Sequence, residues 1–128
     1  QHDAGHDNST SAGLEYGICH LQVEHLIILA HSSCGGVDAA MHPEKIAGSV
    51  YLSGWLNQID NNILAENVDQ SAQNLLHRSH ENCLTYPWVK ERVDAGKLTI
   101  HRWFFDIGAS RILAYSSETS SFVDLDAA

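Results

Sequence analysis

The chain has 128 residues, a length that corresponds to one domain. Its 7 Lys and Arg residues are outnumbered by 16 Asp and Glu, and the net charge of −9 disfavours binding to the phosphate backbone of nucleic acids. Hydrophobic residues make up 44% of the chain and charged residues 18%, which is typical of a folded domain and excludes a disordered one. The longest strongly apolar run, Leu26–Ala30, is far shorter than the ~20 residues of a membrane-spanning helix, so we expect no membrane partner.

The cysteine content and the N-terminus bear on the cellular compartment. Three cysteines are an odd, small number that fits a reducing compartment better than a disulfide scaffold. No charged segment followed by an apolar one opens the chain, so no secretory signal is visible. We therefore expect a single domain over residues 1–128 in the cytoplasm, or in an organelle if a targeting segment lies upstream.

The N-terminal part is predicted to be a loop followed by a helix. Residues 1–8 are polar and show no periodicity, whereas Leu14, Ile18 and Leu21 recur at the spacing of one helix face. Cys19 lies beside Ile18 on this helix, and we expect it to be a small core residue.

The middle of the chain alternates between a strand and helices. The apolar, partly β-branched run Leu26–Ala30 is typical of a strand buried on both faces, as in a parallel sheet under helices. Apolar residues at helical spacing then predict helices in four stretches, at residues 37–41, 55–63, 68–76 and 88–93. This alternation indicates an α/β fold.

The C-terminal part is predicted to be a β-hairpin. Residues 98–107 are rich in aromatic and β-branched residues and predict a strand, residues 108–110 form the turn, and residues 112–115 return as a second strand. The tail after Ser116 is small and polar, and no further element is predicted there. The predicted fold is an α/β domain with a mostly parallel sheet, flanking helices and a C-terminal antiparallel hairpin.

The segment that follows the predicted buried strand, residues 31–36, carries the residues best suited to chemistry. His31 and Cys34 can face one metal ion only if the chain turns after the strand, and Gly35 and Gly36 permit a tight turn. If Cys34 begins the next helix, the helix dipole favours its thiolate, which is the form that binds zinc. An imidazole and a thiolate at the end of a buried strand are half of a tetrahedral zinc site. Spacing alone is equally compatible with a structural histidine and an inert cysteine.

We assign no catalytic or metal-binding role to the other histidines, to Cys83 or to the acidic residues. The remaining histidines are scattered and mostly flanked by polar residues, as surface or helix-capping histidines are: His2, His6, His20, His25, His42, His77, His80 and His101. Cys83 is interpreted as a packing residue. Five carboxylates are interpreted as a solvated helix face rather than an acid–base pair: Glu66, Asp69, Glu81, Glu91 and Asp94.

Four stretches of the chain closely resemble the β-class carbonic anhydrases. They are residues 13–37, which include His31-Ser32-Ser33-Cys34-Gly35-Gly36, then Trp55-Leu56, residues 81–89 and residues 98–107. The resemblance extends over most of the chain in the family's order. It implies the family's fold, a Zn²⁺ cofactor with His31 and Cys34 as ligands, and a homodimer or higher oligomer, because the family's active site lies at a dimer interface.

The chain departs from the family pattern at one important motif. The family takes a further cysteine ligand and an Asp–Arg pair from a C-x-D-x-R motif on an earlier strand, and this sequence contains no such motif. The chain therefore resembles the C-terminal two-thirds of the family domain, without its N-terminal strands. Only His31 and Cys34 carry over as zinc ligands, and the catalytic Asp–Arg pair carries over to no residue. His2, His6 or a partner's cysteine are the candidates for a replacement ligand.

The resemblance implies reversible hydration of CO2 to bicarbonate and a proton, by attack of a zinc-bound hydroxide on CO2. CO2 and bicarbonate are then the small-molecule partners. Two alternatives stay open: an inactive truncated paralogue or fragment that acts as a partner-binding module, and a hydrolase of carbonyl sulfide or carbon disulfide on the same scaffold. Zinc content discriminates the first alternative, and a panel of substrates discriminates the second.

Overall fold

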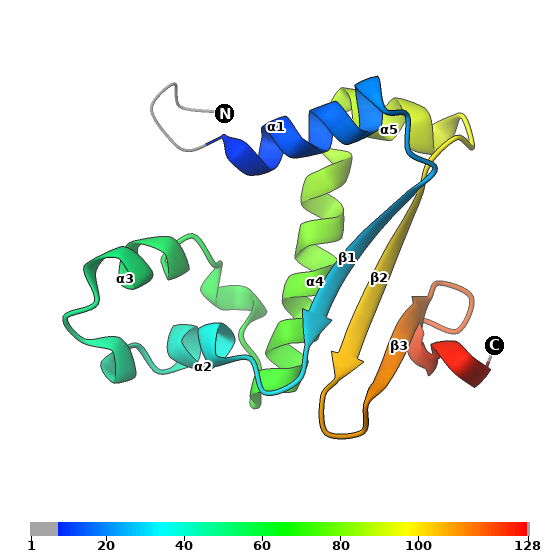
Figure 1. Cartoon of the computed structure of the whole chain (residues 1–128). Coiled ribbons are helices and arrows are strands. Elements are labelled where there is room, and N and C mark those ends of the chain that lie inside the picture. The colour runs from blue at the N-terminus through cyan, green and yellow to red at the C-terminus, as the bar shows by residue number, and fades with distance from the viewer. Residues whose placement is uncertain (1–7, 128) are drawn as a thin grey trace.

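The computed structural model describes residues 8–127 and contains a four-stranded sheet in the order β1-β2-β3-β4 (Figure 1). Strand β1 (His25–His31) pairs in parallel with β2 (Thr99–Asp106), and β2 pairs antiparallel with β3 (Arg111–Ser116). Strand β4 (Ser121–Asp124) pairs antiparallel with β3. All of the helices from α2 to α5 lie on the crossover between β1 and β2, which a parallel pair requires.

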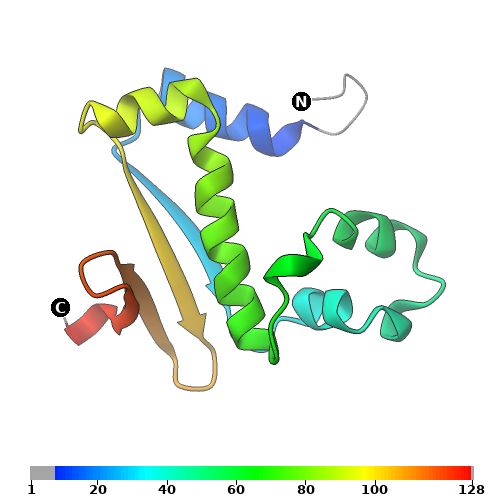
Figure 2. The same ribbon diagram turned by 180° about the vertical axis from the view of Figure 1, so that it is seen from behind.

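The longest helix, α4 (Val68–Leu84), lies across one face of β1 and β2, as Figures 1 and 2 show from opposite sides. Its first turn is capped by Asn67, whose side-chain oxygen accepts a hydrogen bond of 2.8 Å from the backbone N–H of Gln70. The other α-helices are α1 (Ser9–Glu15), α2 (Gly35–Met41), α3 (Val50–Leu56) and α5 (Pro87–Asp94). None of the helices within residues 8–127 has the length and apolar content needed to cross a membrane.

Two clusters of buried side chains fix the helices against the sheet. Ile18, Val89 and Leu98 form the first cluster, where the N-terminal helix and α5 meet the start of β2. Val37, Ala72 and Phe104 form the second cluster, which joins α2 and α4 to the far end of β2. The turn between β1 and α2 is therefore flanked by residues that pack against this second cluster, Ala30 and Cys34.

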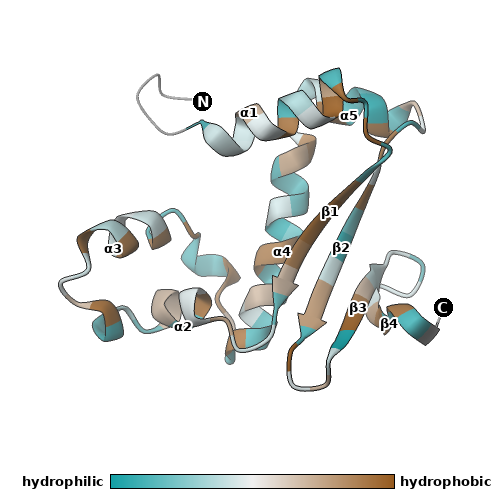
Figure 3. Cartoon of the chain, viewed as in Figure 1, coloured by the Kyte–Doolittle hydropathy of each residue, from teal (hydrophilic) through white to brown (hydrophobic). Residues whose placement is uncertain are grey.

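The sheet face opposite α4 is largely uncovered. Alternate residues of a strand point to opposite faces, and Ala30 packs into the cluster beneath α4. Ile27 and Leu29 are on the other face and are 47% and 59% exposed. Figure 3 shows that most of β1 is hydrophobic. Strand β1 is also the edge strand, so the prediction that it is buried on both faces is wrong for the part of the chain that the structure describes.

The α/β class and the C-terminal hairpin are confirmed, and the sheet adds two features to the prediction. Within residues 8–127, one strand pair is parallel and two are antiparallel, so the sheet there is mixed and not mostly parallel as predicted. The polar tail after Ser116 contributes β4, whose Phe122 packs against the second buried cluster. A four-residue strand with one large inward side chain is too short for its alternation to be recognised in the sequence.

Two predicted helices end earlier than their periodicity suggests. The N-terminal helix finishes in a π-helical turn, Tyr16–His20. Because a π turn adds a residue per turn, Leu21 leaves the face that buries Ile18 and is 60% exposed. The helix predicted over residues 55–63 is divided, since α3 stops at Leu56 and a 3-10 turn occupies Asn61–Ile63.

A polar cluster joins α4 to the sheet at His77. A guanidinium group only donates hydrogen bonds, so Arg102 Nη1 donates to His77 Nδ1 at 2.9 Å, and the Arg102 guanidinium carbon lies 4.1 Å from the centre of the Tyr115 ring. Burial lowers the pKa of His77, and the charge of Arg102 lowers it further, whereas Glu81 opposes the shift. His77 is therefore held neutral as an acceptor.

We expect the protein to lose stability in mild acid through His77. Its pKa in the folded state lies below the ordinary value of 6.5, so the unfolded state binds more protons, and stability decreases as pH falls below that value. Replacing His77 with Gln keeps an acceptor for Arg102 and should reduce the change in urea midpoint between about pH 7.5 and 5.5. The exposed control His20→Gln should keep the wild-type dependence. A variant at position 77 with an unchanged dependence would contradict this assignment.

Candidate metal centre

The candidate centre lies at the turn that links β1 to α2. His31 is the last residue of β1, and Cys34 directly precedes the first residue of α2, Gly35. Ser33 adopts the left-handed conformation with φ of +52°, which is uncommon for a residue other than glycine. Gly35 and Gly36 belong to α2, and neither has a positive φ. The turn predicted at the two glycines is therefore made at Ser33.

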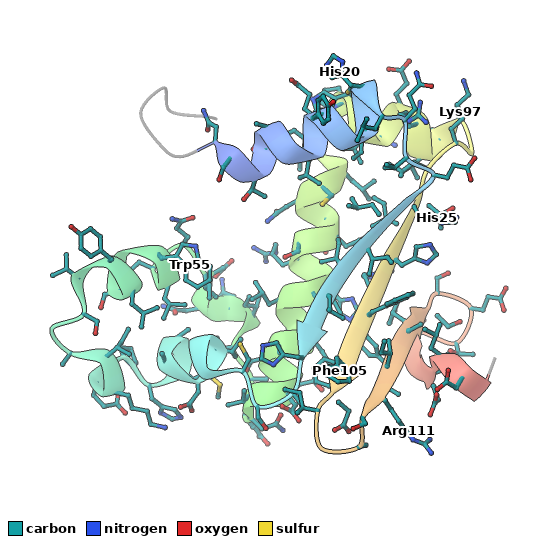
Figure 4. The ribbon with its side chains drawn as sticks, in the orientation of Figure 1. His20, His25, Trp55, Lys97, Phe105 and Arg111 are labelled. Carbon is teal, nitrogen blue, oxygen red and sulfur yellow. The ribbon has the colours of Figure 1, made fainter. Side chains whose placement is uncertain are left out.

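Three hydrogen bonds fix this turn to its neighbours. The backbone N–H of Ser32 donates to the carbonyl of Phe105 at 2.9 Å, and its side-chain oxygen accepts from the N–H of Ile107 at 2.9 Å. The N–H of Ser33 donates to the carboxylate of Asp69, on α4, at 2.8 Å. The turn is thus attached to β2 on one side and to α4 on the other, which offsets the strain at Ser33. Figure 4 shows Phe105 at the end of β2 beside this turn.

The ring of His31 has a defined tautomer. Its Nδ1 lies 2.8 Å from the carbonyl oxygen of Ser32, and because a carbonyl only accepts, Nδ1 carries the proton. Nε2 then carries the lone pair that a metal ion requires. An Nδ1–H bond to a backbone carbonyl is a common outer-shell arrangement for a ligating histidine. The donor chemistry of His31 therefore fits a metal ligand.

Cys34 is half-buried against the second cluster of the core. Cys34 and His31 both line a cavity formed by residues of β1, α2 and α4, most of them apolar: Ile28, Leu29, Ala30, Val37, Ala72, Leu75 and Leu76. The imidazole and thiolate are donors that zinc prefers. The two predicted ligands thus line the same mainly apolar cavity.

The other candidate ligands are not brought to this centre. Within residues 8–127, no three side chains of His, Cys, Asp or Glu are grouped so that they could hold a metal ion. His2 and His6 lie outside the described residues. Cys83 packs in the first core cluster, as predicted, and burial raises the pKa of its thiol. Cys19 is exposed, so the prediction that it is a core residue is wrong.

Sequence reasoning missed Asp69 and Ser32. Asp69 is exposed, in agreement with its interpretation as part of a solvated helix face, and its carboxylate also accepts from the Ser33 N–H. The two residues are 36 positions apart in the chain. No local pattern indicates such a contact, although an acidic residue in the first turn of a predicted helix is a signal for an N–H partner.

Comparison with known sequences identifies one family. The family described as carbonic anhydrase matches residues 2–112. The chain is 31% identical to a carbonic anhydrase of Helicobacter pylori strain J99, covering 92% of this chain and 60% of the relative. It is 28% identical to the chloroplastic beta carbonic anhydrase 5 of Arabidopsis thaliana, covering 80% of this chain and 42% of the relative. The chain thus spans about half the length of these relatives.

Comparison with solved structures supports the fold. The beta-carbonic anhydrase CcaA superimposes with a TM-score of 0.81 at 22% identity, covering 94% of this chain and 65% of the other. A tetrameric beta-carbonic anhydrase of Sordaria macrospora superimposes with a TM-score of 0.71 at 27% identity, covering 84% of this chain and 60% of the other. The chain therefore has the fold of these beta-carbonic anhydrase structures over most of its length.

Replacing Cys34 with Ser should remove most zinc binding. The loss should exceed the ~10–100-fold that outer-shell changes typically cost, because a ligand itself is removed. Titration calorimetry with Zn²⁺ measures the affinity. Cys19→Ser and Cys83→Ser are the matched controls and should bind zinc as the wild type does. Equal losses in all three variants would exclude Cys34 as a specific ligand.

Replacing Asp69 with Ala should weaken zinc binding indirectly. Without the carboxylate, the N–H of the strained Ser33 loses its acceptor, and the turn that carries both ligands loosens. We expect a loss of about 10-fold in zinc affinity, with little change at the control Glu66→Ala, an exposed carboxylate ahead of α4. An affinity that is unaffected at Asp69→Ala would show that the turn is fixed by β2 alone.

Proposed function

Because the chain belongs to the β-carbonic anhydrase family, we propose that its candidate metal centre serves the reversible hydration of CO2 to bicarbonate and a proton. The observation that carries this proposal is the tautomer of His31. With Nδ1 donating to the Ser32 carbonyl, Nε2 is left with the lone pair that a zinc ligand needs, and His31 and Cys34 both line the same cavity.

Two residues of this chain would hold the zinc ion, His31 through Nε2 and Cys34 through its thiolate. When bound, zinc supplies a Lewis acid that brings the ionisation of water to about pH 7. A catalytic zinc site has three protein ligands, so the proposal requires one further ligand from outside the described residues. The family's cysteine on an earlier strand is the donor we propose.

The cavity beside the two ligands suits the substrate. CO2 is small, uncharged and nonpolar, and the walls formed by Val37, Leu75 and Leu76 are apolar. These side chains would admit CO2 and exclude bulk water from the reacting carbon. Carbonyl sulfide and carbon disulfide share this size and polarity, so a substrate panel must include them.

A second candidate function is an inactive, partner-binding module. The observation that favours it is the absence of a C-x-D-x-R motif from the sequence, which leaves no Asp–Arg pair to orient water. The uncovered sheet face would then be the binding surface. Zinc content separates the two candidates, since only the enzyme requires the metal.

Self-association is the partner proposal that we favour. The edge of β1 has no strand partner among the described residues, and a long apolar edge promotes pairing with another chain. On α3, the large apolar side chain of Trp55 is 65% exposed. The Sordaria macrospora structure is titled tetrameric. A homodimer or higher oligomer in the cytoplasm remains our prediction, although two Arabidopsis thaliana relatives are named chloroplastic and mitochondrial.

The zinc-loaded 128-residue chain alone should show little CO2 hydration in a stopped-flow assay, because its ligand set is one short. Fusion behind the segment of the Helicobacter pylori relative that precedes the matched region should restore hydration well above the buffer rate. Cys34→Ser and His31→Ala in the fusion should abolish the restored activity, and Cys83→Ser should not.

One result would contradict the proposed function, and another would contradict the prediction that the chain alone shows little activity. A fusion that binds zinc through His31 and Cys34 but hydrates no CO2 would reject the carbonic anhydrase reaction, and turnover of carbonyl sulfide or carbon disulfide would then assign the alternative chemistry. High activity of the unfused chain would show that it completes the ligand set by itself, for example with His2 or His6.

The protein should have a mass above that of a monomer in light scattering at micromolar concentration. Leu29→Lys, on the uncovered face of β1, should shift the mass towards the monomer, because a charge in an apolar contact is costly. Leu21→Lys is the control, since Leu21 is exposed to the same extent, 60% against 59%, but lies outside the sheet. A monomeric wild type would contradict the prediction.

A further inference from the structure

A pair of histidines lies on the uncovered face of the sheet, away from the candidate metal centre. His25 is the first residue of β1 and His101 lies on β2, where its direct partner is Ile27. The Nδ1 atom of His25 is 3.0 Å from the Nε2 atom of His101, and the ring centres are 5.2 Å apart. The contact is exposed to solvent, and Figure 4 shows His25 projecting from the start of β1.

The nitrogen separation matches that of two ligands on one metal ion. With metal–nitrogen bonds of about 2.1 Å and a cis angle of about 90°, as in tetragonal Ni²⁺ and Cu²⁺ sites, two ligand nitrogens lie about 3.0 Å apart. A tetrahedral angle would require about 3.4 Å. Each ring must turn so that its lone pair points beside the other nitrogen rather than at it, and exposed side chains turn freely.

The backbone holds the two histidines in place. His25 begins the parallel ladder, and the N–H of Thr99 donates to the carbonyl of Glu24 at 2.9 Å beside it. The Trp103 ring lies 6.2 Å from the His101 ring and borders the pair on one side. A second ligand that is already in reach makes its bond intramolecular, which raises the overall affinity.

We propose that His25 and His101 form a bidentate site for a divalent transition-metal ion of Ni²⁺ or Cu²⁺ type, with water completing the coordination. The six-residue separation from His25 to His31 along β1 is roughly 20 Å, so this ion and one at the candidate metal centre would be separate. The cavity next to His25 is lined by Glu24 but also by Arg92 and Lys97. Net charge therefore gives a cation no advantage, and binding rests on the imidazoles.

The test is titration calorimetry with Ni²⁺ on the Cys34→Ser variant, which removes the thiolate of the candidate metal centre. We expect one Ni²⁺ per chain, and a loss of at least about 10-fold in affinity for either His25→Ala or His101→Ala. The double variant should bind no more tightly than either single one, since each single change already breaks the chelate. His20→Ala is the matched control, because His20 is exposed but stacks on the Tyr16 ring rather than on an imidazole.

The Ni²⁺ affinities of these variants distinguish a site shared by the two histidines from independent binding to surface histidines. Unchanged affinity in either single variant would overturn the proposal. Far-UV circular dichroism establishes that the variants fold. Thermal melting gives a second readout, because Ni²⁺ should raise the Tm of the parent protein but not of the variants at positions 25 and 101.

Discussion

The parallel pairing of β1 with β2 is the interaction on which the rest of this structure depends. It sets His31 opposite Phe105, so that Ser32 can bond to the end of β2 and turn the chain into α2. The same register sets Ile27 opposite His101 and brings His25 to that ring at the other end of the strand. A slip by one residue would turn both features to the wrong face.

Helix α4 covers one face of the sheet and leaves the other face exposed. On its own face it buries Ala72 against Phe104, supplies Asp69 to the turn, and leaves a small apolar cavity beside Cys34. The opposite face keeps Leu29 in contact with solvent. Apolar side chains on an edge strand are costly in water, so the same packing that builds the candidate metal centre also leaves a surface suited to a second chain.

The candidate metal centre would supply two of the three protein ligands that a catalytic zinc site has. Hydrogen bonds hold the turn that carries these two residues. The carbonyl of Ser32 selects the tautomer of His31, and Ser33 holds its left-handed conformation because Asp69 and β2 bond to the turn. If His31 and Cys34 bind a metal ion as proposed, these contacts hold the turn that carries them in place beforehand, which lowers the cost of binding. The family's remaining ligand and its Asp–Arg pair come from a motif that this sequence does not contain.

The sequence by itself determined the α/β class, helix α5, the N-terminal half of α4, the hairpin of β2 and β3, and the placement of His31 and Cys34 around one turn. Each of these depends on residues that are close together in the chain. The spacing of their apolar side chains indicates whether the segment is a helix, a strand or a turn. Only the tertiary structure decided that β1 is an exposed edge, that Asp69 binds Ser33, and that His25 meets His101 from 76 positions away. Periodicity shows which face of an element is apolar, but which neighbour covers that face depends on long-range packing.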